Sequence, residues 1–82
     1  MQEKSWMKAG AYVMINSEAG YEREVIDALR KLPGVKEAHL VQGSYDIIAC
    51  IEAESMEEIK NILSWKIRRL NRIRATRTAI IV

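Results

Sequence analysis

The sequence predicts one small α+β domain whose elements follow in the order β-α-β-β-α-β. Segments rich in β-branched residues and tyrosine alternate with segments in which apolar residues recur at helical spacing. Pro33-Gly34 and Gly43-Ser44 separate these segments, and a capping-box sequence begins at Ser55. The 82 residues suffice for one domain only, so we predict a domain over residues 9–82 and a lead-in over residues 1–8.

The first predicted strand, residues 9–16, contains Tyr12, Val13 and Ile15, which favour extended structure. Ser17 is predicted to cap the following helix, and Gly20 allows the turn before it. Pro33-Gly34 ends that helix. Its apolar face is expected to consist of Tyr21, Val25, Ala28, Leu29 and Leu32.

Residues 35–42 and 45–53 are predicted to form an antiparallel hairpin across the short Gly43-Ser44 turn. The second helix follows a Ser55 cap, with Glu58 reaching back, and is predicted to end near Asn71. Residues 74–82 form the last predicted strand. The apolar stripe of the second helix is expected to consist of Met56, Ile59, Leu63, Ile67 and Leu70.

Right-handed crossovers place both helices on one face of a four-stranded antiparallel sheet, which is the ferredoxin-like arrangement. Successive strand residues point to opposite faces, yet both faces of the predicted sheet are apolar. A sheet with one solvated face shows polar residues there. We therefore expect a second copy of the chain to cover the free face. The expected interface residues are Tyr12, Met14, Ile48 and Cys50, with Trp65, which lies off the helix stripe, as a further contact.

The composition excludes several classes of protein. The net charge of +2 is too balanced to indicate nucleic-acid binding by itself. Cys50 and His39 are the only residues of their types, so the sequence offers no disulfide and no metal-ligand spacing. No apolar run is long enough to span a bilayer, and no cleavage pattern follows the apolar segment near the start. We expect a cytoplasmic protein without a cofactor.

The sequence shows no nucleophile elbow, phosphate loop or dinucleotide fingerprint, so we do not expect an enzyme.

One group of residues is suited to binding a free amino acid. Its backbone N–H groups and threonine hydroxyls can donate to the ligand's carboxylate, while its aspartate can accept from the ligand's ammonium. Ordinary turn chemistry and β-favouring threonines would give the same pattern. The group consists of Gly43, Ser44, Tyr45, Asp46, Thr76 and Thr78.

A basic run extends through the end of the second helix into the last strand. It is interpreted either as a solvated face or as a nucleic-acid platform, and the few aromatic residues on the strands favour the first interpretation. The run consists of Lys66, Arg68, Arg69, Arg72, Arg74 and Arg77.

Three segments, Leu32–Val35, Val41–Ile48 and Ala75–Val82, resemble the C-terminal effector domain of the Lrp/AsnC family, called the RAM domain. The likeness extends over residues 11–82. It implies a ferredoxin-like fold, dimers formed through the sheets, octamers or similar rings, and amino-acid effectors bound between dimers. The family pattern places Gly43, Tyr45, Asp46, Thr76 and Thr78 in the effector region.

The sequence departs from this family in two places. Family members usually carry an N-terminal helix-turn-helix, whereas only a short segment precedes the first strand here. We expect a stand-alone RAM protein without direct sequence-specific DNA binding, able to assemble with full-length relatives. Asn71-Arg72-Ile73 also stands where the family usually has Pro-Gly-Val.

The leading hypothesis is a homo-oligomeric, amino-acid-sensing module that modulates transcription or metabolism. The alternatives are a small dimeric enzyme of the monooxygenase type, a nucleic-acid-binding module that uses the basic run, and an ACT-type regulatory domain.

Overall fold

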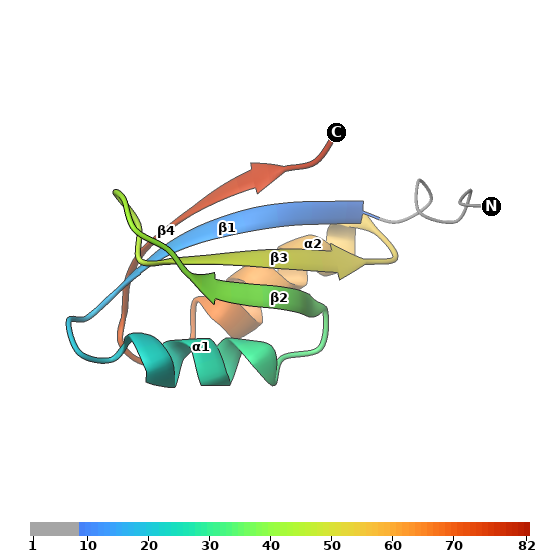
Figure 1. Cartoon of the computed structure of the whole chain (residues 1–82). Helices are drawn as coiled ribbons and strands as arrows, with labels where there is room; N and C mark the ends of the chain where they lie inside the picture. Colours follow the sequence, from blue (N-terminus) through green and yellow to red (C-terminus); the bar gives the residue numbers. More distant parts are fainter. Residues whose placement is uncertain (1–8) are drawn as a thin grey trace.

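The four strands form one antiparallel sheet in the order β2-β3-β1-β4 (Figure 1). The computed structural model describes residues 9–82, and the predicted lead-in over residues 1–8 lies outside them. The ferredoxin-like α+β prediction is confirmed. In chain order the elements are β1 (Ala9–Ser17), α1 (Glu22–Arg30), β2 (Val35–Leu40), β3 (Ile47–Ala53), α2 (Met56–Asn61), the π-helical segment η2 (Ile62–Ile67) and β4 (Ile73–Ile80).

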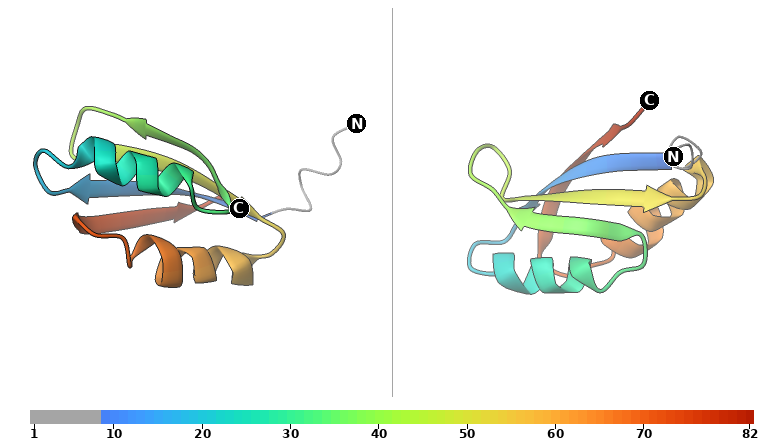
Figure 2. Two further views of the ribbon diagram at one scale, coloured as in Figure 1. Left: turned by 90° about the horizontal axis from the view of Figure 1, so that it is seen from below. Right: turned by 45° about the vertical axis from the view of Figure 1, so that its right-hand side comes forward.

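Both helical segments lie on the same face of the sheet, and no element of the described chain covers the other face (Figure 2). The core lies between the helices and the face of the sheet that they cover. The two central strands supply six of its thirteen buried residues, because each strand is flanked by neighbours on both sides. Its fully buried members include Ala11, Val13 and Ile15 of β1, Ile47, Ala49 and Ile51 of β3, and Val25, Leu29, Ile59 and Ile67 from the helices.

The start of α1 differs from the prediction. Ser17 is not a helix cap, since it is the last residue of β1 and pairs with Ile73 of β4. Tyr21 occupies the cap position, and no side chain there bonds the first turn. The buried stripe also includes Ile26, which the predicted face omitted.

The second helix changes its winding midway. Ser55 caps α2 as predicted, because its Oγ accepts from the Glu58 N–H at 3.2 Å. In η2 the Arg68 N–H donates to the Leu63 carbonyl at 3.2 Å, an i to i+5 bond that widens the turn. Ile62 and Ile67, five residues apart, are therefore buried together.

The predicted helical stripe is consequently wrong in part. Met56 is exposed, Leu63 is only half-buried, and the helical winding ends at Ile67 and not near Asn71.

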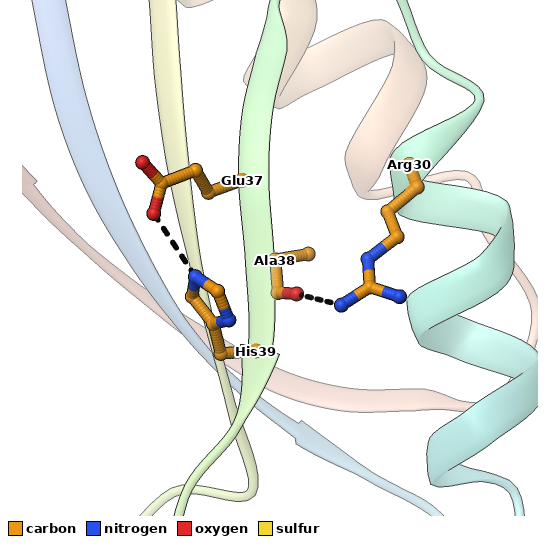
Figure 3. A network of polar contacts seen from close by, with 4 residues as sticks. All are labelled: Arg30, Glu37, Ala38 and His39. Carbon is orange, nitrogen blue, oxygen red and sulfur yellow. Dashed lines mark hydrogen bonds and ion pairs between the residues drawn. The ribbon is translucent and has the colours of Figure 1, made fainter.

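The exposed edge of β2 is partly closed by α1. Arg30 Nη2 donates to the Ala38 carbonyl at 2.6 Å (Figure 3). An unpaired carbonyl on an edge strand invites pairing with another chain. The guanidinium occupies that acceptor and so disfavours sheet extension at β2.

Arg72, in the turn before β4, has left-handed backbone geometry with φ of 74°. It stands at the position where the family resemblance predicts glycine. Its guanidinium lies 4.2 Å from the centroid of the Tyr21 ring and 3.4 Å from Glu18 Oε1. The Arg72 carbonyl also accepts from the Glu18 N–H at 2.8 Å. These contacts join the turn to the loop before α1 and offset the backbone strain.

We expect Arg72→Ala to lower the free energy of unfolding by about 0.5–2 kcal/mol, because it removes the ring contact and the ion pair but leaves the strain. Arg72→Gly loses the same contacts yet relieves the left-handed strain, which is worth roughly 1 kcal/mol. Urea unfolding of both variants measures the difference. Equal losses in the two variants would show that the turn carries no strain.

Candidate functional site

The uncovered sheet face carries a row of apolar side chains from the two central strands. Tyr12 pairs with Cys50 and Met14 pairs with Ile48 across β1 and β3, so all four lie side by side on that face. Tyr12 is 45% exposed, and the other three are half-buried. The four strand residues predicted for an interface thus share one face. We call this row the open-face patch.

Charges of opposite sign border the open-face patch. Arg77 of β4 pairs with Met14 on one side. On the other side, Glu37 and His39 of β2 pair with Cys50 and Ile48. His39 Nε2 lies 2.9 Å from Glu37 Oε1 (Figure 3).

This hydrogen bond, together with the charge of His39, lowers the pKa of Glu37. The contact therefore stabilises the fold above the carboxyl's ordinary pKa and is lost as the pH falls through the lowered value.

The loop between β2 and β3 is longer than the predicted two-residue turn. The ladder stops at the pair Leu40–Ile47, and the Val41 N–H donates to the Asp46 carbonyl at 2.8 Å. Gly43 and Ser44 are exposed in this loop, and Gly43 has φ of 147°. The loop is longer because β2 ends at Leu40 and not at residue 42, and β3 begins at Ile47 and not at Tyr45.

Asp46 is held by its neighbours. Its Oδ2 accepts from the Ser17 N–H at 3.0 Å, and its own N–H donates to the Ile15 carbonyl at 3.0 Å. The carboxylate therefore ties the loop to the end of β1, in addition to any ligand role.

Thr76 and Thr78 lie elsewhere. They pair with Ile15 and Val13 of β1, and so face the helical side of the sheet. There they line a hollow of about 290 Å³ beside Leu63 of η2. Asp46 lines a different hollow, so the six residues predicted for an amino-acid site do not enclose one cavity within a single chain. Their joint role stays a prediction.

Trp65, the remaining predicted contact residue, lies on η2 and is 62% exposed. The Arg69 guanidinium lies 5.0 Å from its ring centroid. Over residues 9–82, no cluster of three or more possible metal-ligating side chains occurs. None of the helices described is long and apolar enough to cross a membrane.

The structure is a small ferredoxin-like α+β domain with one apolar face of its sheet uncovered. The family described as Lrp/AsnC ligand binding domain matches residues 10–82, and the chain belongs to this family.

Relatives in sequence and structure agree with this assignment. An uncharacterised HTH-type transcriptional regulator of Pyrococcus horikoshii, PH1916, is 36% identical over 59 residues, which cover 72% of this chain and 39% of that protein. The crystal structure of FFRP-DM1 is similar with a TM-score of 0.86 and 35% identity, covering 90% of this chain and 99% of that one. The chain spans less than half the length of the curated relatives it matches.

A more distant likeness concerns the fold alone. The transcriptional regulator NMB0573 from Neisseria meningitidis, solved as an L-Met complex, has a TM-score of 0.83 at 13% identity, covering 100% of this chain and 55% of that one.

Proposed function

We propose that this domain is an amino-acid-responsive regulatory module that works as a homo-oligomer and not as an enzyme. The open-face patch is the observation that carries the proposal. A small domain that leaves Tyr12, Met14, Ile48 and Cys50 together on an uncovered face gains stability when a second copy covers them.

The charges beside the patch favour a copy of the same chain as the partner. A twofold axis parallel to the strands sets the β2 edge of one copy over the β4 edge of the other. His39 of one copy then lies level with Arg77 of its partner, and the carboxylate of Glu37, which bonds His39, lies beside that pair, while the apolar row meets itself. Complementary charges at the rim fix the orientation of such an interface.

Membership of a ligand-binding family supports the sensing role. An amino acid is the proposed effector, and the L-Met complex of NMB0573 shows that the same fold is found with such a ligand. Assembly into larger rings, with the effector between dimers, is part of the proposal.

The relatives named as HTH-type transcriptional regulators suggest the partners. We propose that the chain acts on transcription through mixed assembly with such regulators. The described residues contain no helix-turn-helix, since both helical segments pack on the sheet. The 82-residue chain alone should therefore show no sequence-specific DNA binding, and nanomolar binding to a defined duplex at physiological salt would contradict this.

Two measurements test the main proposal. Light scattering should give a mass of at least two chains at micromolar concentration. A thermal-shift screen against the twenty amino acids should find at least one that raises the melting temperature, because a ligand that binds the folded state stabilises it by RT ln(1 + [L]/Kd). A monomer that none of them stabilises would overturn the proposal.

We expect Asp46→Asn to weaken effector binding by roughly tenfold to a hundredfold. The change removes the charge that holds an ammonium, a contact worth roughly 1.5–3 kcal/mol, but keeps an oxygen for the Ser17 N–H. Thr76→Val should weaken binding less, because a neutral hydroxyl makes a weaker bond. Calorimetric titration measures both variants.

Asp46→Ala serves as the comparison for Asp46→Asn. It leaves the Ser17 N–H without its acceptor and should lower the melting temperature as well as the affinity. Unchanged affinity in Asp46→Asn would remove this carboxylate from the ligand site.

A further inference from the structure

The single histidine of the chain lies at the rim of the open-face patch. His39 belongs to the edge strand β2 and pairs with Ile48, which is a member of the patch. Ile48 pairs in turn with Met14, and Met14 pairs with Arg77 of β4. These four residues form one line across the uncovered face, with an imidazole at one end and a guanidinium at the other.

In the single chain, the surroundings of His39 favour a proton on its ring. Its Nε2 lies 2.9 Å from Glu37 Oε1, and both side chains are more than half exposed (Figure 3). A carboxylate at hydrogen-bond distance and the surrounding water both stabilise an imidazolium. The free chain can therefore accept a proton at His39 without loss of an existing contact.

The proposed dimer changes these surroundings. The twofold axis that sets the β2 edge of one copy over the β4 edge of the other brings the partner's Arg77 level with His39. Stacked sheets lie about 10 Å apart, a gap that two long side chains can bridge from opposite sides. Within residues 9–82, Arg77 takes part in no ion pair that would neutralise its charge. Exclusion of water between the sheets strengthens the interaction of these charges.

We propose that protonation of His39 weakens the dimer, so that the association of two chains is sensitive to pH. A neutral imidazole leaves the charge of Glu37 free to attract the partner's Arg77. An imidazolium neutralises that carboxylate and repels the arginine. The inference rests on the proposed function, and it adds to the proposed dimer the residue that regulates its formation.

The sign of the effect follows from the two environments. Glu37 and water stabilise the charged ring in the free chain, whereas the partner's Arg77 and the loss of water destabilise it in the dimer. The dimer therefore binds fewer protons than two free chains. By linkage, association is strongest at high pH and weakens as the pH falls through the range in which histidine gains its proton, between about pH 8 and pH 5.

The other charged groups near His39 do not oppose this effect. The hydrogen bond with His39 and its charge lower the pKa of Glu37, so this carboxylate stays ionised over the whole range. Arg30 of α1 lies on the other side of β2, where it donates to the Ala38 carbonyl (Figure 3). The charged and titratable groups of the elements around His39 are Lys36 and Glu37 of β2, Cys50 and Glu52 of β3, Arg30 of α1 and the partner's Arg77, and Lys36 is paired with Glu52 at 3.5 Å.

Sedimentation of the wild-type chain at about pH 8 and about pH 5.5 tests the inference, with circular dichroism to check that the chain stays folded. We expect the dissociation constant of the dimer to rise about tenfold to a hundredfold at the lower pH, because the twofold axis creates two such contacts and their factors multiply. An equal or smaller constant at the lower pH would overturn the inference alone. A chain that is monomeric at both pH values would overturn the proposed dimer with it.

Two replacements of the histidine separate its charge from its shape. His39→Gln keeps a donor for Glu37 but takes up no proton, so its dissociation constant should be the same at both pH values. His39→Lys carries a permanent charge and should associate weakly at both. Full pH dependence in His39→Gln would show that another group titrates.

Arg77→Gln tests the partner's side of the contact. It removes the repelling charge and should abolish most of the pH dependence, whatever it does to the dissociation constant at pH 8. Arg74→Gln is the matched control, because it removes the same charge from the same strand but lines the hollow beside Glu22 of α1. It should keep the wild-type response. Equal loss of the response in both variants, or full response in Arg77→Gln, would overturn the inference.

Discussion

Ile48→Asp is expected to convert the protein from a dimer into a folded monomer. Ile48 lies on the uncovered face between Met14 and His39, so its side chain is outside the core. In a dimer formed through that face, the change buries an unpaired carboxylate on each copy. An uncompensated buried charge costs about 3–5 kcal/mol, which weakens the dimer more than a hundredfold. Light scattering over a concentration series measures the shift.

Two control variants separate this effect from a general loss of stability. Ile47→Asp places the same charge one residue earlier, on the fully buried side of β3, and should unfold the domain. Asn61→Asp adds a charge at an exposed helix position and should leave both mass and melting temperature unchanged. An Ile48→Asp protein that remains a dimer with native stability would place the interface on another surface.

The strand faces could be predicted from the sequence because side chains alternate with a period of two whatever the exact ends of a strand. Tyr12 and Met14 were thus assigned to the free face correctly, although β1 ends one residue later than predicted. The element order followed from segment lengths and turn residues. An error of one or two residues at a strand end changes neither the element order nor the face to which a side chain is assigned.

Features that depend on the winding of the backbone could not be predicted in this way. The stripe of the second helix assumed α-helical spacing, and the i to i+5 bond that buries Ile62 has no signature in the residue pattern. The bulge at Arg74, between the pairs Asn16–Ala75 and Ser17–Ile73, depends on pairing with β1, which is distant in sequence. The hollow that Asp46 lines together with Ser17 and Arg74 could therefore not be predicted, because Ser17 was interpreted as a helix cap and Arg74 as part of a basic run.

Gly34→Ala is expected to destabilise the domain more than any other glycine replacement in residues 9–82. Gly34 has φ of 94°, and a Cβ there would lie 2.5 Å from Ile62 Cδ1. The left-handed backbone costs a non-glycine residue roughly 1–2 kcal/mol, and the overlap in a packed core adds about 1–3 kcal/mol. We expect a loss of about 2–5 kcal/mol in the free energy of unfolding, measured by urea titration.

Gly20→Ala separates the two causes, because Gly20 has a similar φ of 88° but nothing lies within 4 Å of a Cβ there. It should show the backbone cost alone, roughly 1–2 kcal/mol. Ile62→Val removes the methyl group that a Cβ at position 34 would strike, at its own cost of about 0.5–1.5 kcal/mol. The Gly34→Ala and Ile62→Val double variant should therefore be more stable than the sum of the single changes predicts. Strict additivity would show that Ile62 moves aside freely, and that the close approach of the loop to η2 does not require glycine.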